Sequence, residues 1–166
     1  TLGNASVTAV YMAQDSGATV HADKYMSTTM PAFSAKPSST QSDIAVGSAV
    51  IVDLATEVFD QGSNFLSNTF TAPVTGKYQF NASLYLLNVD VDSTSFSIII
   101  LTTLGQYELA FNPDQVLAAD DSHSMTLSVL ADMDATDTAI LKVYQTGGAQ
   151  QTDIHADSRF SGYLVC

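Results

Sequence analysis

The most constraining stretch of this sequence is residues 69–86, where a proline–glycine turn leads into ten residues of strict alternation. Within residues 77–86 every second side chain is hydrophobic or aromatic, and the intervening ones are mostly polar. The positions that we expect on the buried face are Tyr78, Phe80, Ala82, Leu84 and Leu86. A period of two in an aromatic-rich segment predicts a β-strand with one buried face. Pro73 and Gly76 supply the backbone conformations of a tight turn before it.

The rest of the chain repeats this kind of element and shows no convincing helical periodicity. Short runs of apolar, β-branched and aromatic residues are separated by turns rich in Gly, Asn, Asp and Pro. We predict further strands at residues 45–54, 57–59, 95–103, 107–111, 125–129, 139–144 and 159–165. Short connections without crossover helices favour antiparallel pairing. The sequence therefore predicts an all-β fold, a sandwich or jelly roll.

Length and charge limit the possible partners. A chain of 166 residues and 17.6 kDa suits one main domain. Its net charge of −12, from 17 acidic and 5 basic residues, argues against nucleic acid and anionic membranes as partners. No apolar run has the length of a membrane span. The single cysteine, Cys166, cannot form an internal disulfide, so we expect a free thiol, with an interchain bridge as the alternative.

The composition changes near residue 30. Residues 1–30 hold two short extended segments and no collagen-like repeat, so we predict an N-terminal arm or stalk end. Residues 31–166 form the predicted main domain.

Several motifs resemble those of the C1q/TNF-like jelly-roll domains. The run Phe-Thr-Ala-Pro-Val-Thr-Gly-Lys-Tyr-Gln-Phe at 70–80 is similar to the family pattern F-x-A-P-x-x-G-x-Y-x-F. Pro-Ala-Phe-Ser-Ala at 31–35 resembles the family's opening motif, and Phe-Ser-Gly-Tyr-Leu-Val at 160–165 its last strand. The turn at 133–139 also fits, although Thr136 stands where the family has glycine and Ala139 where it has valine.

The resemblance implies a two-sheet antiparallel jelly roll that assembles as a homotrimer, which would carry a charge of 3 × (−12) = −36. It also implies structural roles, in the core or along the threefold axis, for Phe70, Tyr78, Phe80, Phe160, Gly162 and Leu164. The chain has no collagen stem and no tryptophan. Its low Lys and Arg content and β-type arm resemble a phage or bacterial fibre tip more than an animal complement protein.

No enzymatic motif is present. His123 lies among acidic and serine residues, but a Ser-His-Asp site needs convergence in space that adjacency does not provide. The sequence lacks both a G-x-S-x-G elbow and an H-E-x-x-H pair. We therefore predict a protein that is not an enzyme and requires no cofactor.

Calcium is the metal that the sequence favours, because clustered carboxylates provide the oxygen ligands that it prefers. The clusters that we consider are Asp90 with Asp92, Asp120 with Asp121, and Asp132 with Asp134 and Asp137; the selected metal candidates are Asp90, Asp92, Asp134 and Asp137. None shows a diagnostic spacing. A second possibility is Asp153, His155 and Asp157, which would share one face if that segment were extended.

Recognition in β-scaffolds is usually carried by loops. We place it in residues 88–94, 112–124 and 147–157; the candidates are Asp90, Asp92, Asn112, Asp120, Asp121, His123, Asp153 and His155. Exposed tyrosines expected on polar strand faces, for recognition or for the trimer interface, are Tyr85, Tyr107, Tyr144 and Tyr163.

The resulting hypothesis is a trimeric head at the tip of a fibre or stalk that binds a cell-surface glycan or protein multivalently. It would be extracellular, on a virion fibre or bacterial surface. The alternatives are a structural trimerisation cap of a fibre and a secreted cytokine- or complement-like ligand.

Overall fold

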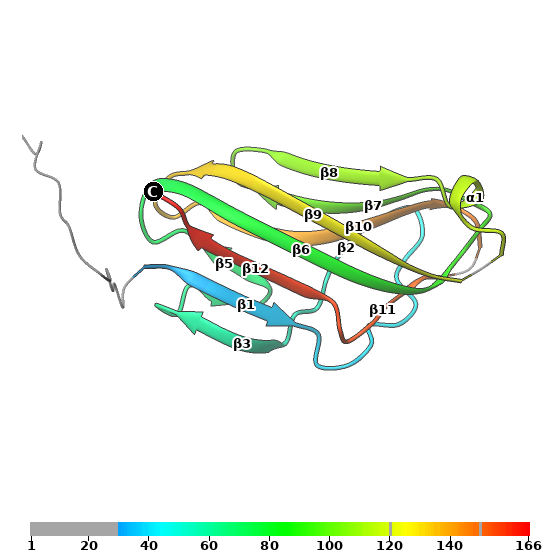
Figure 1. Cartoon of the computed structure of the whole chain (residues 1–166), viewed down its shortest axis with the longest axis horizontal. Helices are drawn as coiled ribbons and strands as arrows, with labels where there is room; N and C mark the ends of the chain where they lie inside the picture. The colour runs from blue at the N-terminus through cyan, green and yellow to red at the C-terminus, as the bar shows by residue number, and fades with distance from the viewer. Residues whose placement is uncertain (1–29, 120, 150) are drawn as a thin grey trace, which may run out of the picture.

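Two six-stranded sheets face each other in a computed structural model of the chain (Figure 1). The structure describes residues 30–119, 121–149 and 151–166. The predicted arm, apart from Met30, and the candidate Asp120 therefore lie outside the described residues. All pairs of named strands are antiparallel, as the sequence predicted.

Sheet A is built around the long strand that the alternation predicted. That strand is β6 (Gly76–Val89), which pairs with β9 (Asp121–Met133) on one side. On its other side lie β11 (Asp153–Ile154) and β12 (Arg159–Leu164). The sheet continues from β12 to β1 (Ala32–Lys36) and the edge strand β3 (Thr56–Gln61).

Sheet B packs behind sheet A in the view of Figure 1. Its central strands are β10 (Thr138–Gly147) and β7 (Ser93–Thr102), and β8 (Gln106–Phe111) forms one edge. At the other edge β10 pairs with β5 (Thr69–Thr71) along one part and with β2 (Ala49–Ile51) along another. The two-residue strand β4 (Phe65–Leu66) completes the sheet beside β5.

An aromatic cluster fills the core between the sheets. Phe33 stacks on Phe65 and Phe70, with ring centroids 4.7 and 5.0 Å apart. Phe80 and Phe160 stack at 5.8 Å on the sheet A side. All the aromatic rings of this cluster are at most 3% exposed. Such ring pairs add packing energy beyond the area that they bury, so this cluster anchors the fold.

The predicted alternation of β6 is confirmed. Tyr78, Phe80, Ala82, Leu84 and Leu86 are each 0% exposed, and the residues between them face outward. The Tyr78 hydroxyl donates a hydrogen bond to the carbonyl of Val74 at 2.8 Å. Burial raises the pKa of Tyr78, and this hydrogen bond opposes the shift.

Both ends of the described chain meet at one end of the sandwich, which we call the basal end. The Leu164 amide donates to the carbonyl of Pro31 at 3.1 Å, and the Lys77 amide donates to the carbonyl of Cys166 at 2.8 Å. The Cys166 thiol is free and exposed. Thr136, in the β9–β10 turn, has φ of 80°, a left-handed conformation that favours the glycine usual in similar turns.

Three local expectations were wrong. Of residues 45–54 only Ala49–Ile51 form a strand, because the next backbone amides bond to side chains and not to a neighbouring strand. The Gln41 side chain accepts the Asp53 amide, and the Asn68 side chain accepts the Leu54 amide. The described residues also contain one short helix, α1 (Pro113–Val116). Tyr107 lies on the inner side of β8 and packs against the core, because it pairs with the buried Ile100.

The described part of the chain contains no helix with the length and hydrophobicity needed to cross a lipid bilayer.

Candidate functional site

The three loops in which we expected recognition meet at the end of the sandwich opposite the basal end, and we call it the apical end. The apical end comprises the β6–β7 turn, the α1 segment with the start of β9, and the segment between β10 and β11. Strand register brings them together, because Val89 pairs with Asp121 and Ser93 pairs with Gly147. In Figure 1 they lie at the right, beside α1.

Asp90 is a structural anchor of the apical end. It is 4% exposed, and its carboxylate accepts the amides of Asp92 at 2.9 Å and Ala149 at 2.7 Å. Gly148, with φ of 72°, passes so close to this carboxylate that a Cβ there would collide with it. Asp90 thus ties the β6–β7 turn to the segment after β10, and its bonds to amides compete with any cation.

A buried chain of side-chain hydrogen bonds continues below Asp90. The Gln145 amide donates to the Ser93 hydroxyl at 2.9 Å, and the Thr152 hydroxyl donates to the Gln145 carbonyl oxygen at 2.8 Å. All three residues are at most 1% exposed. Satisfied buried polar networks of this kind stiffen the loops that they join.

Asp153 also has a structural role. Its carboxylate accepts the Asp43 amide at 2.8 Å and the Asn88 side-chain amide at 3.0 Å. It therefore joins the loop before β2 to the end of β6.

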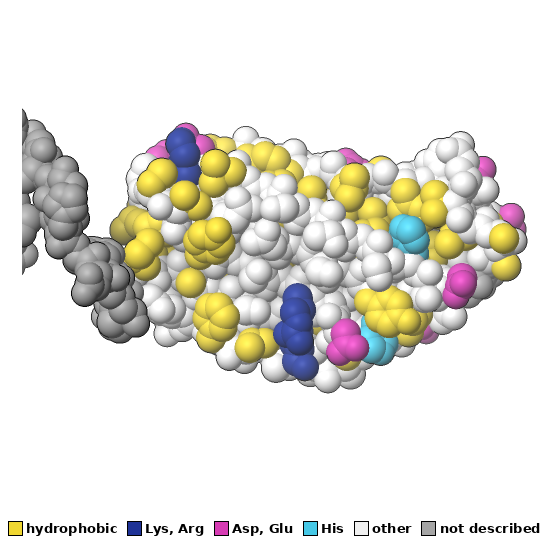
Figure 2. Space-filling model, in the orientation of Figure 1, with side chains coloured by type: hydrophobic (Ala, Val, Ile, Leu, Met, Phe, Trp, Pro, Cys, Tyr) yellow, Lys and Arg dark blue, Asp and Glu magenta, His cyan; other side chains and the backbone are white. Residues whose placement is uncertain are grey.

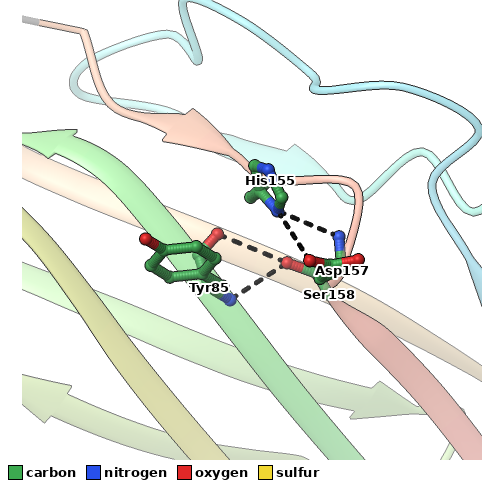
Figure 3. A network of polar contacts seen from close by, with 4 residues as sticks. All are labelled: Tyr85, His155, Asp157 and Ser158. Atoms are coloured by element: carbon green, nitrogen blue, oxygen red, sulfur yellow. Dashed lines mark hydrogen bonds and ion pairs between the residues drawn. The ribbon is translucent and has the colours of Figure 1, made fainter.

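Figure 3 shows a second cluster, on the outer face of sheet A near the apical end. Both β11 and β12 pair with β6, and the Ser158 side chain bonds to β6 in the gap between them. Its hydroxyl accepts the Tyr85 amide at 3.0 Å and lies 3.4 Å from the Tyr85 carbonyl. The His155 amide donates to the same carbonyl at 2.8 Å. Both backbone groups of Tyr85 on this side are therefore held, and its ring is 36% exposed.

The His155 ring packs edge-on against Tyr85, with ring centroids 5.0 Å apart. Its Nδ1 accepts the Asp157 amide at 3.2 Å and lies 3.5 Å from a carboxylate oxygen of Asp157. The first contact suits neutral histidine and the second suits the protonated form. The turn at 155–158 also separates Asp153 from Asp157, so the extended arrangement considered for a metal does not form.

The contacts do not form a catalytic triad, although serine, histidine and aspartate are all present. Ser158 is 0% exposed and its hydroxyl bonds the Tyr85 backbone. The Nδ1 of His155 faces Asp157. A triad would require His155 to contact the serine hydroxyl, which would itself have to be accessible. The cluster is therefore suited to holding Tyr85 and Asp157 at the surface.

The remaining apical candidates differ in their surroundings. His123 stacks on Phe111 with ring centroids 4.3 Å apart. The Asp121 carboxylate accepts the Ser122 amide at 2.7 Å. Asp92 and Asn112 are exposed, and Asn112 directly precedes α1.

The two pairs of calcium candidates lie at opposite ends of the sandwich. Asp134 and Asp137 belong to the basal β9–β10 turn, where Asp137 accepts the Asp134 amide at 2.8 Å. Gly76 pairs with Met133 and Val89 with Asp121, so β6 separates this turn from Asp90 by about 40 Å. Among the described residues no three acidic, histidine or cysteine side chains converge as a metal site.

The outer face of sheet A carries few acidic groups, and one of them, Asp153, lies on the two-residue strand β11 at the apical end. On outward positions of β1, β6, β9 and β12 the only carboxylate is Asp132, which pairs with Lys77 at 3.3 Å. Lys36 and Arg159 lie on the same face. Figure 2 shows this face, and its centre is largely free of acidic side chains.

Comparison with known proteins identifies this architecture. A sequence model of the C1q domain matches residues 32–165. The chain belongs to the C1q domain family. Its match includes every named strand of both sheets.

Solved structures share the fold of this C1q domain at low sequence identity. The globular domain of zebrafish complement 1qA protein is 15% identical, with a TM-score of 0.57, and the match covers 82% of this chain and 98% of that one. Murine APRIL at pH 8.5 is 10% identical, with a TM-score of 0.58, and the match covers 82% and 99%. No match is found among curated protein sequences. The C1q/TNF-like jelly roll that the motifs predicted is thus confirmed.

Proposed function

We propose that this C1q domain is the trimeric head of a fibre or stalk and that it binds a cell-surface glycan or protein multivalently. The single observation that carries the proposal is that the outer face of sheet A carries few acidic side chains, in a chain of the C1q family. That face is a surface on which copies of a strongly acidic chain can meet. C1q and TNF domains typically form homotrimers and bind receptors.

Charge supports this choice of face. With a net charge of −12, copies of the chain repel one another unless the contact avoids carboxylates. Of the four described basic residues, Lys36, Lys77 and Arg159 lie on this face, against the strand carboxylates Asp132 and Asp153. The approach of another acidic chain is therefore least unfavourable here.

The face also carries hydrophobic side chains in a suitable arrangement. Strand register places Leu130, Gln79 and Tyr163 in one row across β9, β6 and β12. Leu130 is 53% and Tyr163 is 49% exposed. The neighbouring row is neutral and polar, with Ser128, Asn81 and Ser161, and the Ser128 hydroxyl donates to Asn81 at 2.9 Å. This mixture of apolar anchors and neutral polar groups is typical of protein interfaces.

Receptor binding is proposed for the apical end. Its exposed groups are held by the Asp90 and Ser158 networks, so little ordering remains to oppose binding. Three such ends on one head would bind together, and weak individual sites would gain through effective concentration.

An extracellular location follows the family pattern, since C1q and TNF domains are usually extracellular or secreted. The fibre-tip location, on a virion or bacterial surface, is part of the proposal. Calcium is also proposed only for the assembled head: no described trio of side chains forms a site within one chain, so ligands would have to come from more than one chain.

Light scattering after size exclusion tests the assembly. We expect about three times 17.6 kDa for the natural chain and a smaller mass for Tyr163→Asp, which adds a charge to the proposed interface. Leu104→Asp, at a 65% exposed turn position away from sheet A, is the matched control and should remain trimeric. A monomeric natural chain would refute the proposed trimer. Repeating the measurement in the presence of a chelator tests whether the trimer depends on calcium.

Binding is tested separately, with glycan arrays and with cells of candidate hosts. The trimer should bind detectably and the Tyr163→Asp variant should bind much more weakly because avidity is lost. A trimer that binds no glycan and no cell would favour the structural cap over the receptor-binding head.

A further inference from the structure

The outer face of sheet B is the second flat surface of this molecule on which copies can meet. On outward positions of its six strands only Lys142 and Glu108 are charged. This is unusual for a chain with 17 acidic residues. Apolar side chains occupy several of the other positions. Leu66 is 75% and Ile51 is 45% exposed, while Leu101, Ile140 and Tyr144 are partly exposed.

Strand register fixes how these side chains are arranged around β7. Ile99 lies between Lys142 on β10 and Glu108 on β8, in one row across the sheet. In the next row Ser97 lies between Tyr144 and Ala110, and in the row on the other side Leu101 lies between Ile140 and Gln106. In the first two rows, then, the β10 residue and the β8 residue differ in charge or size, and in the third an apolar residue on β10 corresponds to an amide on β8.

This pattern is complementary to itself about one particular axis. A twofold axis along β7, between two facing sheets, places β10 of each copy over β8 of the other. Lys142 then faces Glu108, the large Tyr144 faces the small Ala110, and Ile140 faces Gln106. The axis passes over Ile99, which is 6% exposed in the single chain. A twofold axis across the strands would instead place Lys142 opposite Lys142 and Glu108 opposite Glu108, which is unfavourable.

The charged pair is available for such a contact. Among described residues, Lys142 forms no ion pair, and Glu108 bonds only its neighbour Gln106, at 3.0 Å. Sheets that pack face to face lie about 10 Å apart, a distance that lysine and glutamate side chains can bridge together.

The geometry points to a twofold contact between the sheet B faces of two copies of this chain, held by reciprocal Lys142–Glu108 pairs around Ile99. The contact is isologous, so each copy contributes the same surface. Because the axis runs along β7, the apical ends of both copies point the same way. The contact joins heads side by side.

The contact is small. It involves mainly three strands spaced about 4.8 Å apart, so its area lies at or below the low end of specific interfaces. A single pair of chains is therefore expected to associate weakly. Trimeric heads would present three such faces, and neighbouring heads on one surface would be joined in an array through repeated contacts.

Zero-length carbodiimide crosslinking tests the contact directly. Unlabelled and ¹⁵N-labelled chains are mixed, crosslinked at high protein concentration and analysed by mass spectrometry. We expect an amide between Lys142 of one isotope and Glu108 of the other. A Lys142–Glu108 product found only within single-isotope chains, or no such product, would overturn the inference.

Charge reversal supplies the second test, measured by sedimentation equilibrium. Lys142→Glu and Glu108→Lys should each lower the association constant by about tenfold or more, and the double variant should restore it. Glu57→Lys, on β3 in sheet A, changes the net charge as Glu108→Lys does and should leave association unchanged. Equal losses in the control, or no recovery in the double variant, would contradict the paired arrangement.

The two proposals can fail independently. The sheet B contact joins monomers into pairs, and it joins trimers, which have three such faces, into pairs or larger assemblies. A trimer that never associates further refutes only this contact, and a monomer that forms pairs refutes only the trimeric head.

Discussion

Replacing Gly162 by alanine tests how the aromatic core is packed. Gly162 lies in β12 between Phe33 of β1 and Phe80 of β6, and all three positions face the core. A Cβ at this position would lie 2.6 and 2.8 Å from two ring carbons of Phe80 and 2.9 Å from one of Phe33. Favourable carbon–carbon contacts are about 3.5–4.0 Å, so both rings would have to move by roughly 1 Å.

These rings cannot move independently. Phe33 contacts Phe65, Phe70 and Phe160, and Phe80 stacks on Phe160. Overpacking of such a core costs about 1–3 kcal/mol, while alanine in a strand recovers about 0.5–1 kcal/mol relative to glycine. We expect Gly162→Ala to lower the free energy of unfolding by about 1–2 kcal/mol and the melting temperature by about 2–8 °C.

Calorimetry at one fixed protein concentration measures this effect, with Gly105→Ala as the matched control. A Cβ at Gly105 would meet no atom within 4 Å, so that variant should be neutral or slightly more stable. Adding Phe80→Leu to Gly162→Ala should cost less than Phe80→Leu alone, because the smaller side chain makes room. Equal stability of Gly162→Ala and the natural chain would refute the packing argument.

Three further predictions concern backbone strain and the apical networks. Thr136→Gly should raise the free energy of unfolding by about 0.5–1 kcal/mol in denaturant titrations, because glycine accepts the φ of 80° without steric cost. A decrease would contradict this. Gly148→Ala should lower stability by about 1–3 kcal/mol and speed hydrogen exchange of the Ala149 amide, because the new Cβ collides with the Asp90 carboxylate. Unchanged exchange there would show that Asp90 is not the anchor. Ser158→Ala should cost about 1–3 kcal/mol and speed exchange of the Tyr85 amide, which loses its acceptor, whereas a protected amide would argue against that bond.

The sequence predicted the fold because the alternation in β6 records its burial directly. A strand with one face in the core must alternate, and Tyr78, Phe80 and Leu84 do so without exception. The short elements left no comparable signal. Four residues of α1 cannot show a helical period, and two residues of β11 cannot show alternation. Some backbone amides bond to a side chain where a strand partner would otherwise stand, as the Leu54 amide does to Asn68. Such side chains come from distant residues and cannot be recognised in a sequence.

The apical end was predicted only as separate loops. Their convergence depends on strand register, which the sequence does not state, and the roles of their acidic residues depend on local contacts. Asp90 and Asp92 are two positions apart, yet Asp90 is buried and bonded to amides while Asp92 is exposed. The hydrogen bond between the Tyr85 amide and the Ser158 hydroxyl joins residues 73 positions apart, and no sequence pattern indicated it.

The position of both ends of the described chain at the basal end determines how this domain would respond to mechanical force. A load between a stalk attached before β1 and a ligand held at the apical end would act along the strands. Hydrogen bonds between antiparallel strands run perpendicular to the chain, so β1 would be loaded in shear against β12 and β3. Bonds under shear share the load and break together, whereas bonds that are peeled from one end break one at a time. We therefore expect the domain to resist pulling along this direction better than pulling across the sheets.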